Sequence, residues 1–155
     1  MPPSTLERLR HAGLRVTKPR LSVLAAVESR PHADTVAIID AVRADLGTVS
    51  HQAVYDVLTA LTQARLLRRI ELPGSPARYE SRIGDNHHHL VCRACDAIVD
   101  VDCATGEAPC LTPCDEAGFV VDEAEVVYRG LCPACADAPA TPTPTTPHTP
   151  SEGPR

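Results

Sequence analysis

The stretch His87-His88-His89-Leu90-Val91-Cys92-Arg93-Ala94-Cys95 holds two metal-binding patterns within nine residues. Its two cysteines form a C-x2-C pair, and a second pair, Cys132 and Cys135, follows after 36 intervening residues. Thiolates at this spacing converge on one ion, and two such pairs complete a closed tetrahedral zinc site. The sequence therefore predicts a structural Zn²⁺ that holds the two pairs together, bound by Cys92, Cys95, Cys132 and Cys135.

Residues 84–137 offer little apolar material for a core, with Phe119 as their only phenylalanine. Units of this size usually need a metal ion or a partner subunit for stability. Because 36 residues exceed the usual zinc-ribbon spacing, a subdomain must lie between the two pairs. The pattern predicts strands at 89–92, 97–101, 119–121 and 125–128, and a short helix at 106–116.

Three further cysteines, Cys103, Cys110 and Cys114, belong to neither pair. Small buried residues are the favoured interpretation, since cysteine packs well as a small hydrophobe. A redox couple or a further metal site stays open for the C-x3-C pair. A thioredoxin-like role for a C-x2-C pair is disfavoured, because no βαβ pattern surrounds either one.

The histidines before Cys92 predict a second metal site. On an extended segment, His87 and His89 point to one face and His88 to the other. Together with the carboxylates of Glu80 and Asp100, two imidazoles on one face suit Fe²⁺, Mn²⁺, Co²⁺ or Zn²⁺. A solvated histidine patch is the alternative interpretation.

Upstream of residue 84, the pattern predicts short helices followed by a strand–turn–strand ribbon. The candidate N-caps of the helices are Ser4 or Thr5, Thr17, Asp34 and Ser50. Val36, Ile39 and Val42 are predicted to form the apolar stripe of the third helix. Segments 67–72 and 78–81 flank Pro73-Gly74-Ser75-Pro76, a turn. This order is typical of a winged helix-turn-helix, and a small α+β domain without a DNA role is the alternative.

The net charge of −5 for the 155 residues argues against nucleic-acid binding when it is taken whole. However, residues 1–83 carry +4 and residues 84–155 carry −9, so the two halves differ in kind. Residues 138–155 contain six prolines, which predicts a disordered Pro/Thr-rich tail. The start lacks a secretory signal, and no apolar run reaches membrane-spanning length. We therefore expect a cytoplasmic protein with reduced thiols and no membrane partner.

The basic half offers DNA-facing residues around the starts of the second and fourth predicted helices. Side chains near the N-terminus of a recognition helix reach base edges, while Lys and Arg beside it hold phosphates. Glutamine reads adenine, and an aromatic ring packs on a thymine methyl group. A solvated helix face is the alternative, and Asp56 is unfavourable near phosphate. The candidates are Arg15, Lys18, Arg20, Ser50, Gln52 and Tyr55.

Taken together, these motifs make the chain resemble the ferric uptake regulator (Fur) family of metal-dependent repressors, over about residues 6–136. Each motif is weak alone, but their order and spacing are highly specific. The motifs are Gly13-Leu14-Arg15-Val16-Thr17-Lys18-Pro19-Arg20, Pro31-His32-Ala33-Asp34, Ser50-His51-Gln52-Ala53-Val54-Tyr55, Arg78-Tyr79-Glu80, and the segment 87–95 with Cys132-Pro133-Ala134-Cys135. Segments 78–110 and 52–58 are most similar to the actinobacterial FurA branch, whose members resemble peroxide-responsive repressors of catalase-peroxidase genes.

The resemblance implies an α+β fold, with a winged-helix DNA-binding domain at 1–83 and a small α/β dimerisation domain at 84–137. It implies a homodimer on double-stranded operator DNA with an inverted repeat. The family's structural zinc maps onto the four paired cysteines. Its regulatory Fe²⁺ or Mn²⁺ site maps onto His32, Glu80, His87, His89 and Asp100. His32 enters only through the resemblance, and it would let one ion clamp both domains together.

The resemblance also bears on the signal. Peroxide sensors of the family tend to have aspartate at the position of Asp100, which predicts repression relieved when peroxide oxidises His32 or His89. Oxidation of the zinc thiolates, or iron-uptake control without peroxide sensing, are the alternatives. A third family site would need Asn86, His88, Glu107 and Ala124, of which only two suit a metal. An enzyme is not expected, since no H-E-x-x-H or H-x-E pattern supports a hydrolytic metal site.

Overall fold

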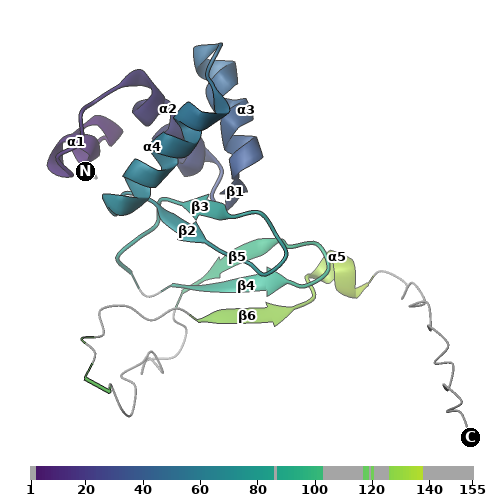
Figure 1. Ribbon diagram of the computed structural model, residues 1–155. Coiled ribbons are helices and arrows are strands. Elements are labelled where there is room, and N and C mark those ends of the chain that lie inside the picture. The colour runs from purple at the N-terminus through teal and green to yellow at the C-terminus, as the bar shows by residue number, and fades with distance from the viewer. Residues whose placement is uncertain (1–2, 86, 103–116, 119, 121–125, 138–155) are drawn as a thin grey trace, which may run out of the picture.

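The computed structural model describes residues 3–85, 87–102, 117–118, 120 and 126–137. Within these ranges the chain has the predicted mixed α+β fold, with a helical N-terminal layer stacked on two small sheets (Figure 1). No helix among the described residues is long and apolar enough to cross a membrane. The predicted helix at 106–116 and the tail lie outside the described residues. So does the predicted strand at 119–121 apart from Val120, which is not in a strand.

Four helices open the chain, and each begins after an N-cap that the sequence predicts. They are α1 (Thr5–His11), α2 (Lys18–Ser29), α3 (Thr35–Leu46) and α4 (His51–Gln63). Each cap's side-chain oxygen accepts a hydrogen bond from a backbone N–H of the first turn, which is otherwise unpaired. The capping residues are Ser4, Thr17, Asp34 and Ser50.

The helices share one apolar core, and the prediction that Val36 belongs to it is wrong. Val36 is 64% exposed, whereas Ile38, Ile39 and Val42 are buried. The inward stripe of α3 runs from Thr35 through i+3, i+4 and i+7. Val36 lies about 100° around the helix from the start of that stripe, which turns it to solvent.

The helices are followed by a ribbon that forms the first sheet. Strands β2 (Arg68–Ile70) and β3 (Arg78–Glu80) pair antiparallel, and β1 (Ala33–Asp34) pairs with the other edge of β3. The ribbon is the predicted wing, and Gly74 in its turn has φ +80°, a conformation that glycine adopts without strain. The two-residue strand β1 was not predicted. Its pairing with β3 places His32, the residue before β1, beside β3.

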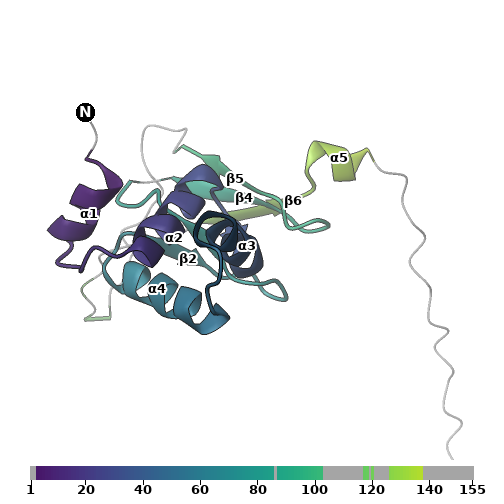
Figure 2. The same ribbon diagram turned by 90° about the horizontal axis from the view of Figure 1, so that it is seen from above.

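The second sheet has β4 (His88–Cys92) at its centre. Strand β5 (Ile98–Val101), within the predicted strand at 97–101, pairs antiparallel with β4. Strand β6 (Val127–Gly130) pairs parallel with β4 on the other side. The short helix α5 (Pro133–Ala136) follows β6 and lies at the opposite end of the molecule from α1 (Figures 1 and 2).

A small apolar cluster joins the two sheets. Ile70 and Leu72 from the ribbon pack with Val91 of β4 and are all at most 5% exposed. This contact packs the winged-helix layer against one face of the second sheet. Polar side chains from both layers therefore meet next to it.

Candidate metal centres

Four cysteine sulfurs gather at one end of the second sheet. The Sγ atoms of Cys92, Cys95, Cys132 and Cys135 all lie within 4.8 Å of one another, and all four are free thiols. Cys95 Sγ lies 3.8 Å from Cys132 Sγ. Four sulfurs at the Zn–S distance of ~2.3 Å form a tetrahedron with edges of roughly 3.8 Å. The donor set and its spacing fit a zinc ion.

Strand pairing brings the two C-x2-C pairs together. Because β4 and β6 run parallel with Cys92 opposite Gly130, each strand delivers its cysteines at the same end of the sheet. The N–H of Arg93 donates to the carbonyl of Gly130 at 2.8 Å, and the N–H of Cys132 donates to Cys92 Sγ at 3.3 Å. Sheet register therefore aligns the two pairs.

The thiols differ in their pKa values. Hydrogen bonds from the backbone N–H groups of Cys132 and Ala94 lower the pKa of Cys92 to about 6. The neighbouring sulfurs, first that of Cys132, raise the pKa of Cys135 to about 12. Four thiolates this close repel one another, so their joint ionisation requires a bound cation.

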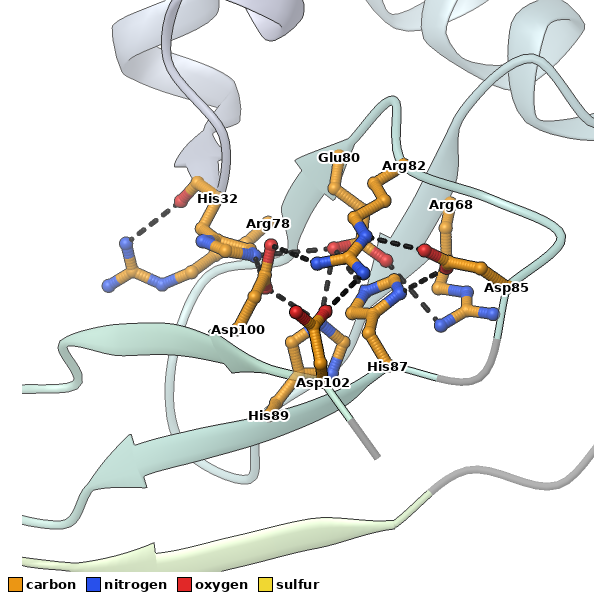
Figure 3. A network of polar contacts seen from close by, with 10 residues as sticks. All are labelled: His32, Arg68, Arg78, Glu80, Arg82, Asp85, His87, His89, Asp100 and Asp102. Atoms are coloured by element: carbon orange, nitrogen blue, oxygen red, sulfur yellow. Dashed lines mark hydrogen bonds and ion pairs between the residues drawn. The ribbon is translucent and has the colours of Figure 1, made fainter. Parts of the chain in front are cut away.

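The second cluster lies between the ribbon and β4 (Figure 3). Glu80 Oε2 is 3.2 Å from His32 Nε2, 3.3 Å from His87 Nε2 and 3.1 Å from His89 Nε2. Asp100 Oδ1 is 2.8 Å from His32 Nε2 and 3.6 Å from His89 Nε2. Five side chains from two layers thus direct nitrogen or oxygen atoms toward one small volume.

This convergence fits a metal ion better than a hydrogen-bond network. One carboxylate oxygen has two lone pairs, yet three imidazole nitrogens surround Glu80 Oε2. Ligand atoms held ~2.0–2.2 Å from a common ion lie roughly 2.8–3.1 Å apart in octahedral geometry and roughly 3.3–3.6 Å apart in tetrahedral geometry, which covers the distances seen here. The mixed N/O donor set suits Fe²⁺, Mn²⁺, Co²⁺ or Zn²⁺.

Glu80 is held as a carboxylate although it is 1% exposed. Burial raises its pKa, but hydrogen bonds with His32 and His89 and the charges of His89 and His87 more than offset that effect. The pKa of Glu80 therefore lies well below its ordinary value. Glu80 is therefore already a carboxylate when a cation arrives, whereas the histidines bind a metal only in their neutral form.

His32 reaches the cluster through an unusual turn. It has φ +63°, a left-handed conformation that costs a non-glycine residue energy. The N–H of His32 donates to the carbonyl of Tyr79 at 2.9 Å, and the guanidinium of Arg78 donates to the carbonyl of His32 at 3.2 Å. The first strand pair therefore holds His32 between α2 and α3, with its ring directed at Glu80.

His87 is held from behind by a carboxylate. Asp85 Oδ1 lies 2.6 Å from His87 Nδ1, which leaves His87 Nε2 directed at Glu80. The ligand atoms that lie within 4.8 Å of one another come from His32, Glu80, His89 and Asp100. His87 adjoins this set through Glu80, and its ring centroid is 5.0 Å from that of His89.

His88 points away from the cluster, as the alternation of β4 predicts. Its ring packs edge-on against Tyr128, with 6.1 Å between centroids. Three of the four positions considered for a third metal site, Asn86, Glu107 and Ala124, lie outside the described residues. The environment of His88 itself is that of a packed aromatic ring.

The residues predicted to face DNA lie at the starts of α2 and α4. Ser50 is the N-cap of α4, and Tyr55 is 47% exposed on that helix. Gln52 donates from Nε2 to Asp56 at 2.8 Å, and Arg20 donates to the carbonyl of Arg15 at 2.7 Å. Lys18 opens α2 and is exposed. Their contact with DNA stays a prediction.

Sequence reasoning missed the residues that hold the ligands in place. Asp85 has the same alternation as His87 and His89, so the pattern contained a usable signal for it. Arg68, 3.5 Å from Glu80 Oε1, and Arg82, which contacts three aspartates, gave no such signal. Their roles depend on strand register and on a loop conformation.

The helices with their ribbon, the four-cysteine cluster and the imidazole–carboxylate cluster together define a winged-helix protein with two candidate metal centres. The model of the ferric uptake regulator family matches residues 11–129. The chain belongs to this family of transcriptional regulators.

Curated relatives refine this placement. The chain is 64% identical over 134 residues to the transcriptional regulator FurA of Mycobacterium tuberculosis, covering 86% of this chain and 91% of that protein. It is 61% identical over 137 residues to ferric uptake regulation protein 2 of Mycolicibacterium fortuitum, covering 86% and 94%. These similarities place it in the actinobacterial FurA branch.

Solved structures share the fold. The Helicobacter pylori regulator Fur, described with three functional metal binding sites, matches with a TM-score of 0.67 at 21% identity, covering 88% of this chain and 94% of that one. The Pseudomonas aeruginosa regulator with manganese gives 0.64 at 24%, covering 84% and 99%. The Campylobacter jejuni peroxide stress regulator gives 0.63 at 20%, covering 86% and 100%.

Proposed function

We propose that this protein is a metal-dependent repressor that binds inverted-repeat operator DNA as a homodimer and responds to iron and peroxide. Residues 1–83 form its DNA-binding domain, and residues 84–137 form its metal-binding dimerisation domain. Its targets are genes for catalase-peroxidase and other oxidative-stress functions. The similarity to mycobacterial FurA supports the regulatory class, and the residues of the two clusters support the metal dependence.

One observation carries the proposal: His32 from the winged-helix layer meets Asp100 of β5 at 2.8 Å. An ion bound by His32, Glu80, His87, His89 and Asp100 links the two layers through short bonds. Binding then favours the arrangement in which these layers are clamped, by the difference in affinity between clamped and unclamped states. In a dimer, clamping sets the separation of the two recognition helices, which must match successive major grooves.

The two clusters hold different ions in this proposal. Cys92, Cys95, Cys132 and Cys135 hold a structural Zn²⁺ in a closed thiolate site. The imidazole–carboxylate cluster holds the regulatory Fe²⁺ or Mn²⁺, which prefer such N/O ligands. Relatives of known structure bind manganese, iron or zinc, as their descriptions state.

Exposed apolar side chains support a dimer through the second sheet. Leu90 of β4 lies opposite Val99 of β5 and Tyr128 of β6, so the three form a row across one face. They are 44%, 57% and 47% exposed, and they lie on the face opposite Val91, which packs against the ribbon. A second copy of the chain covers this row in the proposed dimer.

Peroxide acts at the regulatory cluster. An Fe²⁺ ion held there would supply the electron that cleaves peroxide. His32 and His89 are the ligands that would gain one oxygen atom from peroxide, with water as the second product, and this would impair the ligand set. Mass spectrometry of the peroxide-treated, iron-loaded protein tests this route. Loss of DNA binding without added oxygen on either histidine peptide contradicts it, and zinc release would point to the thiolates instead.

A gel shift on the DNA upstream of the protein's own gene tests the function as a whole. We expect a shifted band with Mn²⁺ or Fe²⁺, loss of that band with chelator, and loss after peroxide only in the Fe²⁺ sample. Metal-dependent binding that survives peroxide supports the alternative, an iron-uptake repressor. Absence of metal-dependent binding to any upstream region contradicts the proposal.

A further inference from the structure

The side chain of Arg82 lies beside the candidate regulatory cluster, among three carboxylates (Figure 3). Its Nε donates to Asp85 Oδ2 at 2.6 Å, and its NH2 group donates to Asp102 Oδ1 at 2.5 Å. Its NH1 group lies 3.9 Å from Asp100 Oδ2, an ion pair rather than a hydrogen bond. One guanidinium thus connects the loop before β4 with β5 and the residue that follows it.

Two of these contacts lead to the cluster. Asp85 uses its second oxygen, Oδ1, to hold His87 Nδ1 at 2.6 Å. Asp100 uses its second oxygen, Oδ1, to contact His32 Nε2 at 2.8 Å. Arg82 therefore contacts two aspartates that each hold a part of the site. Asp85 contacts His87, which faces Glu80, and Asp100 contacts His32.

We propose that Arg82 is a positioning residue that fixes His87, through Asp85, and Asp100 for binding of the regulatory ion. The inference rests on the proposed function of the cluster. A planar guanidinium presents its donors in a rigid fork, so it can hold Asp85 and Asp102 in fixed directions at once. Mutation of a group that orients a metal ligand without binding the metal itself commonly weakens metal affinity by about 10- to 100-fold.

A purely electrostatic role predicts the opposite result. Arg82 carries a positive charge near a site for a cation, so repulsion alone would make its removal tighten metal binding. Arg82 is 41% exposed, and water screens this repulsion. We therefore expect the loss of positioning to exceed the relief of repulsion.

Two substitutions separate geometry from charge in the full-length, zinc-loaded protein. Arg82→Gln removes the charge and the fork, whereas Arg82→Lys keeps the charge and loses the fork. Mn²⁺ binding is followed by the electron paramagnetic resonance signal of free Mn²⁺. We expect both variants to bind Mn²⁺ about 10-fold more weakly than wild type, with unchanged zinc content. Arg69→Gln is the matched control, because Arg69 is exposed and pairs with Glu71.

A double-mutant cycle tests the path through Asp85. If Arg82 acts through Asp85, Arg82→Gln weakens Mn²⁺ binding less in an Asp85→Asn background than in the parent. A merely structural role would give the same factor in both backgrounds and would lower zinc content as well. Wild-type affinity in Arg82→Lys, or tighter binding in Arg82→Gln, overturns the inference.

The proposed cluster has its own control in the same assay. Asp100→Asn should weaken Mn²⁺ binding by more than either Arg82 variant. If Asp100→Asn binds like wild type, the cluster assignment fails, whatever the Arg82 variants do. If Asp100→Asn loses binding while the Arg82 variants retain it, only the positioning role fails.

Discussion

The two candidate metal centres differ in how the chain assembles them. The thiolate cluster lies within one layer, at the end of two parallel strands, and its residues come in two short local motifs. The imidazole–carboxylate cluster joins two layers, and its residues come from a turn, a ribbon and two strands. A site within one layer stabilises that layer, whereas a site between layers controls their arrangement. Loss of metal should therefore destabilise the fold at the first site and uncouple the layers at the second.

The largest expected effect comes from Cys132→Ser. Structural zinc contributes an apparent 10–16 kcal/mol in small zinc modules, roughly the whole stability of a domain. We expect loss of bound zinc, dissociation of the dimer and cooperative loss of the second sheet. Zinc analysis, sedimentation and circular dichroism measure these effects. Cys103→Ser, a cysteine outside both pairs, is the control, and a zinc-replete dimeric Cys132→Ser protein would refute the thiolate assignment.

His89→Ala should separate function from folding. It removes a fully buried nitrogen from the second cluster and leaves the thiolates untouched. We expect metal-dependent DNA affinity to fall by about 100-fold or more, because the histidine is both a proposed ligand and a neighbour of Glu80. Fluorescence anisotropy with operator DNA and Mn²⁺ measures this loss. Zinc content should stay at the wild-type level, and its loss would mean that the two centres are not independent.

A chelator should distinguish the centres without mutation. A closed four-thiolate site holds zinc tightly, whereas the second cluster is partly open, since Asp100 is 25% exposed. Brief treatment with EDTA should abolish DNA binding while zinc and the dimer remain, and added Mn²⁺ should restore binding. Simultaneous loss of zinc and DNA binding would contradict the predicted division of roles.

The smallest expected effect concerns Glu80 and pH. The pKa of Glu80 is lowered in the folded protein, so its charged form stabilises the fold above the unfolded value of 4.5. This contribution is lost as the pH falls through the lower, folded pKa. Without regulatory metal, Glu80→Gln should be less stable than wild type by about 1–3 kcal/mol near pH 7, a charged hydrogen-bond effect.

That stability difference should shrink as the pH falls below 4.5, because the unfolded wild-type chain then binds a proton at Glu80 that the folded protein does not yet bind. Denaturant melts of both proteins across this range measure it. Zinc loss at low pH affects both proteins alike and cancels in the comparison. A difference that stays constant with pH would mean that the charge of Glu80 does not contribute.

The two centres also differ in how far the sequence could predict them. The N-caps, the ribbon and the C-x2-C pairs are local patterns, because each depends only on residues that are close together in the sequence. The facing of His87 and His89 likewise follows from strand alternation. The position of His32 does not, because it depends on a left-handed turn and on the pairing of β1 with β3. Spacing gave no reason to join it to the cluster, and only the family resemblance did.

Arg82 and Val36 show the same limit in two forms. Arg82 acts through contacts with residues up to 20 positions away, which no periodicity encodes. Spacing alone predicts Val36 in the core. In the structure the buried face of α3 includes Thr35 and Ile38 instead, and Val36 faces solvent. Local chemistry was predictable here, and the choice between nearly equivalent helical faces required the packed structure.

The parallel pairing of β4 with β6 has a consequence for how this part of the molecule tolerates change. The register of Cys92 opposite Gly130 and the thiolate cluster beyond it tie both ends of the intervening chain to the same point. Closing a longer loop adds only about 0.6 kcal/mol per doubling of its length. Insertions or deletions in the connection between β5 and β6, outside the strands themselves, should therefore alter the zinc site little.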